Sequence, residues 1–167
     1  MVVRRLTLPD LPAYLLLRRE ALLKDPASFA ASPEDDRALD EGYLREAVGD
    51  PDQALIGAFV PELVGIVGLG RHRGEKSHHK AQLWGLYVGP GHRGGRIGRR
   101  LVEAAVEFAA TLPGVTQVCL CVSERTPVAA GLYRKLGFVT WGVEPDALRI
   151  GGEPVADHHM TLRLPTP

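Results

Sequence analysis

The residues best suited to chemistry lie in the stretch LYVGPGHRGGRIGRRLVEA, residues 86–104, where two glycine patterns overlap. The first, from Gly89 to Gly94, has the form G-x-G-x-x-G that binds a dinucleotide when it lies between a strand and a helix. The second, from Arg93 to Gly98, would leave backbone N–H groups free at the start of a helix, where they can bind a pyrophosphate. The first pattern predicts redox chemistry, and the second predicts group transfer.

The dinucleotide interpretation fails on the position of the loop. That fingerprint normally lies in the first βαβ unit of a domain, and the following strand ends in an acid that binds the ribose. Here the loop lies past mid-chain, and the next strand ends in Cys121-Val122-Ser123, with Glu124 beyond the expected point. Pro90 also lacks an amide that a pyrophosphate would need. The second pattern remains, either as a phosphate site or as a glycine-rich turn with solvated arginines.

Hydrophobic periodicity predicts the elements that position this loop. Apolar runs predict strands, and a spacing of 3.6 residues predicts helices. The expected strands are 2–6, 53–60, 63–70, 81–88, 117–122, 138–143 and 155–164, and the expected helices begin at 11, 41, 97 and 127. In the last helix, Val128, Leu132 and Leu136 are expected to face inward.

The connections between these elements predict the topology. The three strands before the glycine loop follow one another through short turns and should be antiparallel. The strands on either side of the helix that begins at residue 97 should be parallel, because a helical crossover joins them. We therefore expect an α/β fold of the mixed α+β kind in one domain, residues 1–167, with a mostly antiparallel central sheet, one parallel βαβ pair and flanking helices.

Composition argues against several kinds of partner and site. Twenty basic and twenty acidic residues give no net charge, so no global field attracts nucleic acid or a membrane. Cys119 and Cys121 should point to one face of their strand as buried thiols, without a second cysteine pair to bind zinc. The adjacent histidines at 78–79 and 158–159 do not predict a metal site, because neighbours on a strand point to opposite faces. The absence of a signal-peptide core or membrane-length apolar run favours a cytoplasmic protein.

Residues from about 81 to 138 resemble the GNAT superfamily of acetyl-CoA-dependent N-acetyltransferases. The family's acyl-CoA motif, Q/R-x-x-G-x-G/A after a strand, is similar to Arg93-x-x-Arg96-x-Gly98. Its next motif is N-x-x-A-x-x-L-Y-x-x-x-G-F, which is similar to Thr126, Ala129, Leu132, Tyr133, Gly137 and Phe138. The two motifs occur in the right order, separated by one helix and one strand, and this pairing is more specific than a lone glycine loop.

The resemblance implies that acetyl-CoA is the co-substrate and that no metal is needed. Its pantetheine would lie along the first parallel strand, and its pyrophosphate would meet the loop amides. The cofactor-binding residues so implied are Leu86, Tyr87, Val88, Arg93, Gly94, Gly95, Arg96, Ile97, Gly98, Arg99 and Thr126.

This chain departs from the family pattern at three positions. Arg96 stands where glycine is usual, and its backbone is expected to avoid conformations that only glycine adopts cheaply. Thr126 replaces an asparagine, which keeps the capacity to cap a helix but loses an amide. Gln82 lies where several relatives have a glutamate that acts as the base, and an amide cannot accept that proton.

The implied reaction is attack of a primary amine on the acetyl thioester through a tetrahedral intermediate. Tyr133 resembles the family's acid for the departing thiolate, with its ring anchored beside the buried stripe and its hydroxyl reaching a cleft; a packing role is the alternative. The base is left open among Glu124, Asp157, His158 and water, and an amine that is already deprotonated would need none.

The sequence leaves the acceptor amine and the oligomeric state open. Residues 34–36 and 144–153 are expected in loops that border the acceptor site in the family, where their carboxylates could favour a cationic amine or could simply be solvated. The acceptor could be a small-molecule amine or a protein amine, and homodimers are common in the family. A catalytically idle CoA-binding sensor or interaction domain is the alternative function.

Overall fold

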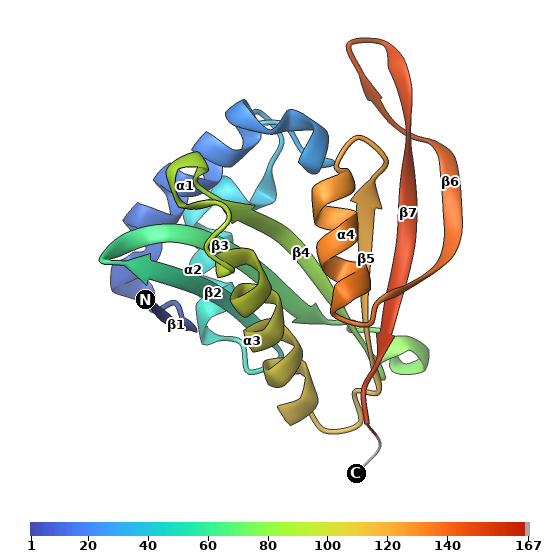
Figure 1. The fold of residues 1–167 in the computed structure, drawn as a ribbon. Helices are drawn as coiled ribbons and strands as arrows, with labels where there is room; N and C mark the ends of the chain where they lie inside the picture. The colour runs from blue at the N-terminus through green and yellow to red at the C-terminus, as the bar shows by residue number, and fades with distance from the viewer. Residues whose placement is uncertain (166–167) are drawn as a thin grey trace.

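A computed structural model describes residues 1–165 and places seven strands in one sheet, in the order β1-β2-β3-β4-β5-β7-β6 (Figure 1). Neighbouring strands are antiparallel except for β4 and β5. The strands are β1 (Val2–Arg5), β2 (Gln53–Val60), β3 (Glu62–Arg71), β4 (Lys80–Val88), β5 (Gln117–Ser123), β6 (Val139–Ile150) and β7 (Glu153–Arg163). The predicted fold class, a mixed and mostly antiparallel sheet with one parallel βαβ pair, is confirmed.

In the part of the chain that the structure describes, four α-helices cover the two faces of the sheet. They are α1 (Leu11–Lys24), α2 (Glu41–Gly49), α3 (Ile97–Thr111) and α4 (Pro127–Lys135). One hydrophobic core joins α1 and α2 to β2, β3 and β4, and a second core joins α3 and α4 to the opposite face (Figure 1). No helix among residues 1–165 is both long enough and apolar enough to span a membrane.

Helix α3 is the crossover that makes β4 and β5 parallel. Ile97, Leu101, Ala105 and Ala109 recur every four residues and are buried against the sheet. On the solvent side, Arg99 forms an ion pair with a glutamate one turn later. This amphipathic pattern is the reason that the helix could be predicted from the sequence.

Strands β4 and β5 pair over only three residues each, from Lys80↔Gln117 to Gln82↔Cys119, although both strands continue beyond this point. Farther along, β4 has a bulge relative to β3, and Gly85 within it adopts a left-handed conformation with φ of 67°. A bulge bends its strand and increases the local twist. The carboxyl ends of the two parallel strands are therefore not hydrogen-bonded to each other.

The hairpin of β6 and β7 is longer than predicted. Residues 144–150, expected in a loop, continue strand β6, and the turn consists of Gly151 and Gly152. Both glycines have positive φ, 60° and 84°, as two-residue hairpin turns require. Pro145 argues against a strand here, because a proline cannot donate a backbone hydrogen bond. It is tolerated because it lies on an edge strand at a register shift.

The two cysteines share one face of β5, but they are not both buried as predicted. Cys119 is half-buried and Cys121 is exposed, because they lie on the face opposite α3 and α4. On the same face, the Trp141 ring of β6 is 69% exposed and stacks beside His159 of β7. The run of apolar residues in β5 therefore did not indicate that both faces of the strand are buried.

Candidate active site

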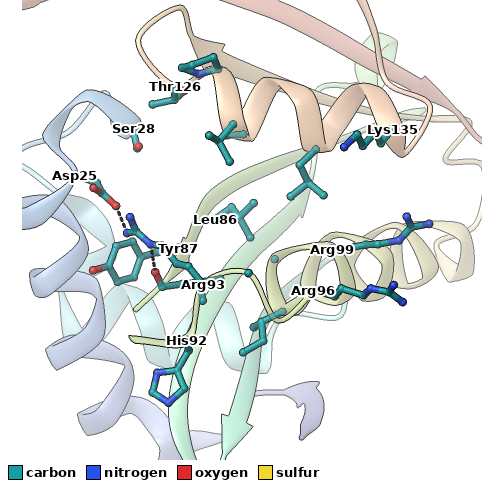
Figure 2. Close-up of a pocket in the computed structure, with 18 of the residues that line it drawn as sticks. Asp25, Ser28, Leu86, Tyr87, His92, Arg93, Arg96, Arg99, Thr126 and Lys135 are labelled. Atoms are coloured by element: carbon teal, nitrogen blue, oxygen red, sulfur yellow. Dashed lines mark hydrogen bonds and ion pairs between the residues drawn. The ribbon is translucent and has the colours of Figure 1, made fainter. Parts of the chain in front are cut away.

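A cavity of about 950 Å³ lies between the glycine loop and α4, with β4 along its floor (Figure 2). It receives side chains or backbone from β4, the loop, the start of α3 and the start of α4. Of the predicted cofactor-binding residues, all but Gly95 line it: Leu86, Tyr87, Val88, Arg93, Gly94, Arg96, Ile97, Gly98, Arg99 and Thr126. The structure therefore brings the two motifs together around one space.

The start of α3 lies at the edge of this cavity. Arg96 precedes the helix with φ of 62° and ψ of 10°, the only non-glycine residue of the described chain with positive φ. The expectation that Arg96 would avoid this conformation is wrong, since the turn imposes left-handed geometry at a cost of about 1–2 kcal/mol. The first helical bond reaches back from Arg100 N–H to the Arg96 carbonyl. The backbone N–H groups before Arg100 therefore have no partner within the helix.

The arginines around the loop have different partners. The Arg93 guanidinium forms an ion pair with Asp25 and donates through Nε to the Val88 carbonyl at 2.9 Å (Figure 2). It thereby ties the segment after α1 to the glycine loop. Arg99 is paired with Glu103 at 2.7 Å. Three further basic side chains line the cavity, those of Arg96, Arg125 and Lys135. They supply most of the positive charge in the lining that is not held in an ion pair.

Of the residues of α4 predicted to face inward, Leu132 and Leu136 pack against the core, whereas Val128 does not. Val128 is 87% exposed and lines the cavity together with Leu132, whereas Ala130 and Tyr133 are the buried residues of the helix. A helix face that lines an apolar cavity has the same pattern of apolar residues as a helix face that packs in a core. Thr126 precedes α4, but its hydroxyl donates to the Ser123 carbonyl at 2.9 Å and does not cap the helix.

Several lining residues were not predicted from the sequence. Val128, Leu132 and Lys135 are spaced by four and three residues, so this face of α4 could have been found from helical periodicity. Asp25 and Ser28 come from the segment after α1, and nothing in their local sequence connects them to the glycine loop. The additional lining residues are Asp25, Ser28, His92, Arg125, Pro127, Val128, Ala129, Leu132 and Lys135.

Tyr133 lies beside the cavity, not in its lining. Its ring is buried at 6% exposure and meets the Phe138 ring edge-on, with 5.7 Å between centroids. Burial raises the pKa of the Tyr133 hydroxyl above its ordinary value, so the group is protonated at neutral pH. A protonated hydroxyl can donate a proton or a hydrogen bond.

The three candidate bases lie in different surroundings. Glu124 accepts a hydrogen bond from the Ala156 backbone N–H at 2.8 Å, which ties the end of β5 to β7. His158 lies on the opposite face of β7 from its neighbours, because strand residues alternate. Asp157 has an Oδ1 atom that is buried without a hydrogen-bond partner among the described residues.

The acidic cluster at residues 34–36 is largely structural. Asp36 forms a buried ion pair with Arg18 at 2.6 Å, and both side chains are about 95% buried. Asp35 accepts hydrogen bonds from the backbone and hydroxyl of Ser32. The cluster therefore holds the segment between α1 and α2 in place. Within residues 1–165, no three His, Cys, Asp or Glu side chains are grouped to hold a metal ion.

A family model described as the acetyltransferase (GNAT) family matches residues 17–138. The chain belongs to this family. The match includes the glycine loop and α4, the two parts that line the cavity. It confirms the resemblance seen in the two motifs, and it establishes acetyl-CoA-dependent acetylation as the general activity of the group to which the chain belongs.

Individual GNAT proteins similar to the chain differ in what they are named for. The chain is 35% identical over 82 residues to a streptothricin acetyltransferase of Streptomyces lavendulae, covering 49% of the chain and 42% of that protein. It is 30% identical over 137 residues to a mycothiol acetyltransferase of Salinispora tropica, covering 79% of the chain and 42% of that protein. The chain thus matches about two fifths of the length of each.

The fold also matches solved GNAT structures. A phosphinothricin acetyltransferase of Sinorhizobium meliloti, solved in complex with acetyl-CoA, superposes with a TM-score of 0.82 at 19% identity. The match covers 98% of this chain and 88% of that chain. At this identity the similarity shows the fold alone and does not identify catalytic residues in this chain.

Proposed function

We propose that this protein transfers the acetyl group of acetyl-CoA to a primary amine of a small molecule, as one domain over residues 1–167. The observation that carries the proposal is the cavity itself, which joins unpaired amides at the start of α3 to an apolar wall from α4 and a floor from β4. Amides at a helix start suit a pyrophosphate, because the positive end of the helix dipole lies there. The apolar walls suit a pantetheine chain.

Four of the predicted cofactor contacts have distinct roles in this proposal. The N–H groups around Ile97 and Gly98 bind the pyrophosphate, and Arg96 adds positive charge at the cavity edge. The backbone of β4 at Leu86 lies where pairing with β5 has ended, so its N–H can donate to the thioester carbonyl. These contacts would orient the thioester for attack and stabilise the oxyanion that develops.

The reaction proceeds by direct attack. The amine nitrogen attacks the acetyl carbonyl carbon, the carbon–sulfur bond of the tetrahedral intermediate breaks, and CoA leaves as a thiol after its sulfur gains a proton. Tyr133 supplies that proton or a hydrogen bond, for which its raised pKa keeps it in the protonated form. Support for a small-molecule acceptor comes from the two curated relatives, which are named for streptothricin and mycothiol.

Acetyl-CoA should stabilise the protein, and NAD should not. A ligand that binds only the folded state at a hundred times its Kd adds about 2.7 kcal/mol to the free energy of unfolding. For a chain of this length, this corresponds to a rise in Tm of about 5–10 °C. Thermal unfolding with each nucleotide measures the effect. A large shift with NAD and none with acetyl-CoA would overturn the cofactor assignment.

Turnover separates the enzyme from an idle CoA-binding domain. Acetyl-CoA consumption with a panel of amines should show release of free CoA thiol that depends on the amine. The panel should include polyamines, aminoglycoside-type amines, amino acids and a lysine peptide, so that small-molecule and protein acceptors are compared. Binding of acetyl-CoA without turnover on any amine would favour the idle domain.

Tyr133→Phe should lower kcat by about 10²-fold, within the usual range for a positioned acid. The substitution removes only the hydroxyl and keeps the ring against Phe138, so the Tm and the Kd for acetyl-CoA should stay unchanged. Tyr14→Phe is the matched control, because Tyr14 is equally buried but packs in the core beneath α1. A kcat equal to that of the wild type at saturating acetyl-CoA would remove Tyr133 from the mechanism.

A further inference from the structure

Strand β7, which lies on the far side of β5 from β4, has a carboxylate level with the thioester site proposed at Leu86. Strand β7 pairs with β5 so that Asp157 lies opposite Ser123 and His159 lies opposite Cys121. The last β4–β5 pair joins Gln82 to Cys119. Leu86 and Ser123 each lie four residues beyond this pair on their own strands. Because residues on both strands advance by about 3.3 Å, Asp157 and Leu86 lie at a similar height along the sheet.

Asp157 lies on the face of the sheet opposite the cofactor wall. Leu120 and Val122 of β5 pack in the core beneath α3 and α4, so the side chains of Cys121 and Ser123 point to the other face. Directly opposed strand residues share a face, which places Asp157 there with them. An amine that approached from this face would reach the thioester from the side that acetyl-CoA leaves open.

The carboxylate of Asp157 lacks a donor. Its Oδ1 atom is buried and has no hydrogen-bond partner among residues 1–165. Burial raises the pKa of Asp157, the charge of Glu144 adds to the increase, and the nearby histidines oppose it. A buried polar oxygen without a partner is unfavourable and uncommon, so a ligand that supplies an N–H would relieve it. An ammonium group has both the donor and the complementary charge.

We propose that Asp157 accepts the proton of the acceptor amine. This inference rests on the proposed acetyl transfer. The acceptor enters as an ammonium ion, and one N–H bond breaks as its proton passes to Asp157 Oδ1. The nitrogen lone pair then forms the bond to the acetyl carbon. The second proton lost from nitrogen goes to the CoA sulfur through the Tyr133 hydroxyl, and Asp157 later returns its proton to solvent.

A hydrogen-bonded pair, His159 and Glu144, lies close to Asp157 on the β6–β7 hairpin. His159 Nε2 lies 3.1 Å from Glu144 Oε2, and its Nδ1 lies 3.3 Å from Cys121 Sγ. Glu144 is opposite Asp157 in the β6–β7 pairing, and its side chain is 57% exposed. The titratable groups near Asp157 are therefore Cys121 and Glu124 from β5 and its end, Glu144 from β6, and His158 and His159 from β7.

Asp157→Asn tests the proposal. The kcat/KM for the amine should fall by about 10²-fold at neutral pH, and the Kd for acetyl-CoA should not change. In the wild type, kcat/KM should rise with pH as Asp157 loses its proton. The pH–rate profile of the variant should lack this rise and keep only the rise that follows deprotonation of the amine. Glu62→Gln is the matched control, since Glu62 is an exposed carboxylate at the start of β3 that does not line the cavity.

Thermal unfolding of the same variant distinguishes catalysis from a structural role. Because the pKa of Asp157 is raised in the fold, stability from its neutral form is complete below the unfolded-state pKa of about 4 and is lost as pH rises through the folded-state pKa. Asparagine cannot ionise, so the variant should have an equal or higher Tm at pH 7, and the difference should close toward pH 4. A structural carboxylate would give a lower Tm.

The outcomes separate this inference from the proposed function. Wild-type turnover together with an inactive, stable Asp157→Asn variant supports both. Wild-type turnover with a variant that retains its rate, or that loses rate and Tm together, overturns the role of Asp157 and leaves the acetyl transfer in place. A wild type that acetylates no amine of the panel overturns the proposed function and this inference with it.

Discussion

Gly98→Asp is expected to weaken acetyl-CoA binding by about 10³-fold and to leave the fold intact. Gly98 is the second residue of α3 and lines the cavity. A Cβ there would lie 3.5 Å from Leu132 and 3.8 Å from Val88, which are ordinary contacts. The added carboxylate would stand beside the pyrophosphate, and two like charges about 4 Å apart repel by about 4 kcal/mol at an effective dielectric constant of 20.

The same substitution should not destabilise the protein. A negative charge in the first turn of a helix interacts favourably with the helix dipole, by about 0.3–1 kcal/mol. Calorimetric titration with acetyl-CoA and thermal unfolding without it measure the two effects separately. Gly98→Asn is the matched control, because it adds nearly the same bulk without the charge and should bind far better than the aspartate. An unchanged Kd in Gly98→Asp would place the cofactor elsewhere.

Asp36→Ala should lower the free energy of unfolding by about 3–5 kcal/mol, because it leaves the Arg18 charge buried without its partner. The guanidinium of Arg18 stacks over Phe29 at 4.6 Å and lies against the β4 bulge, where a Cβ at Gly85 would be 2.9 Å from Nη1. Arg18 Nη1 already lacks a hydrogen-bond partner within the described chain, so no second acceptor is ready to replace Asp36. The fall in Tm should be about 6–20 °C.

Two further variants show whether the buried charge is the cause. Glu34→Ala removes an exposed carboxylate two residues earlier and should change the stability by less than about 0.5 kcal/mol. The double variant Arg18→Met with Asp36→Ala should recover most of the loss, because no unpaired charge remains inside. Urea unfolding of the wild type, Asp36→Ala, Arg18→Met and the double variant gives the coupling energy. A loss below about 1 kcal/mol in Asp36→Ala would mean that water reaches Arg18.

The succession of helices and strands along the chain and the parallel pair could be predicted because each depends on local patterns. The apolar stripe of α3, interrupted only by charged residues on its outer face, required a helix between β4 and β5. A helical crossover then required parallel strands. The loop at residues 93–98 was predicted to bind phosphate because it precedes that helix, and the structure places a cavity beside the loop.

The parts that could not be predicted depend on contacts distant in the chain. Arg18 lies in the middle of α1, where a basic side chain would normally face solvent, and its burial depends on Asp36 from another segment. Arg93 was expected near phosphate from its position alone, but its partner is Asp25, which is 68 residues away. Periodicity could not distinguish the cavity-facing Val128 from a core residue, because both are apolar.

The long strand β6 has a consequence for solubility. It forms one edge of the sheet, so its outer backbone groups could pair with a strand of another molecule. Val139, Trp141 and Val143 expose apolar side chains along its first half. The register shift and Pro145 then interrupt the strand and limit how far a second strand could extend along it. Residues 139–143 are therefore the part of the chain where a single lysine would most reduce aggregation at high concentration.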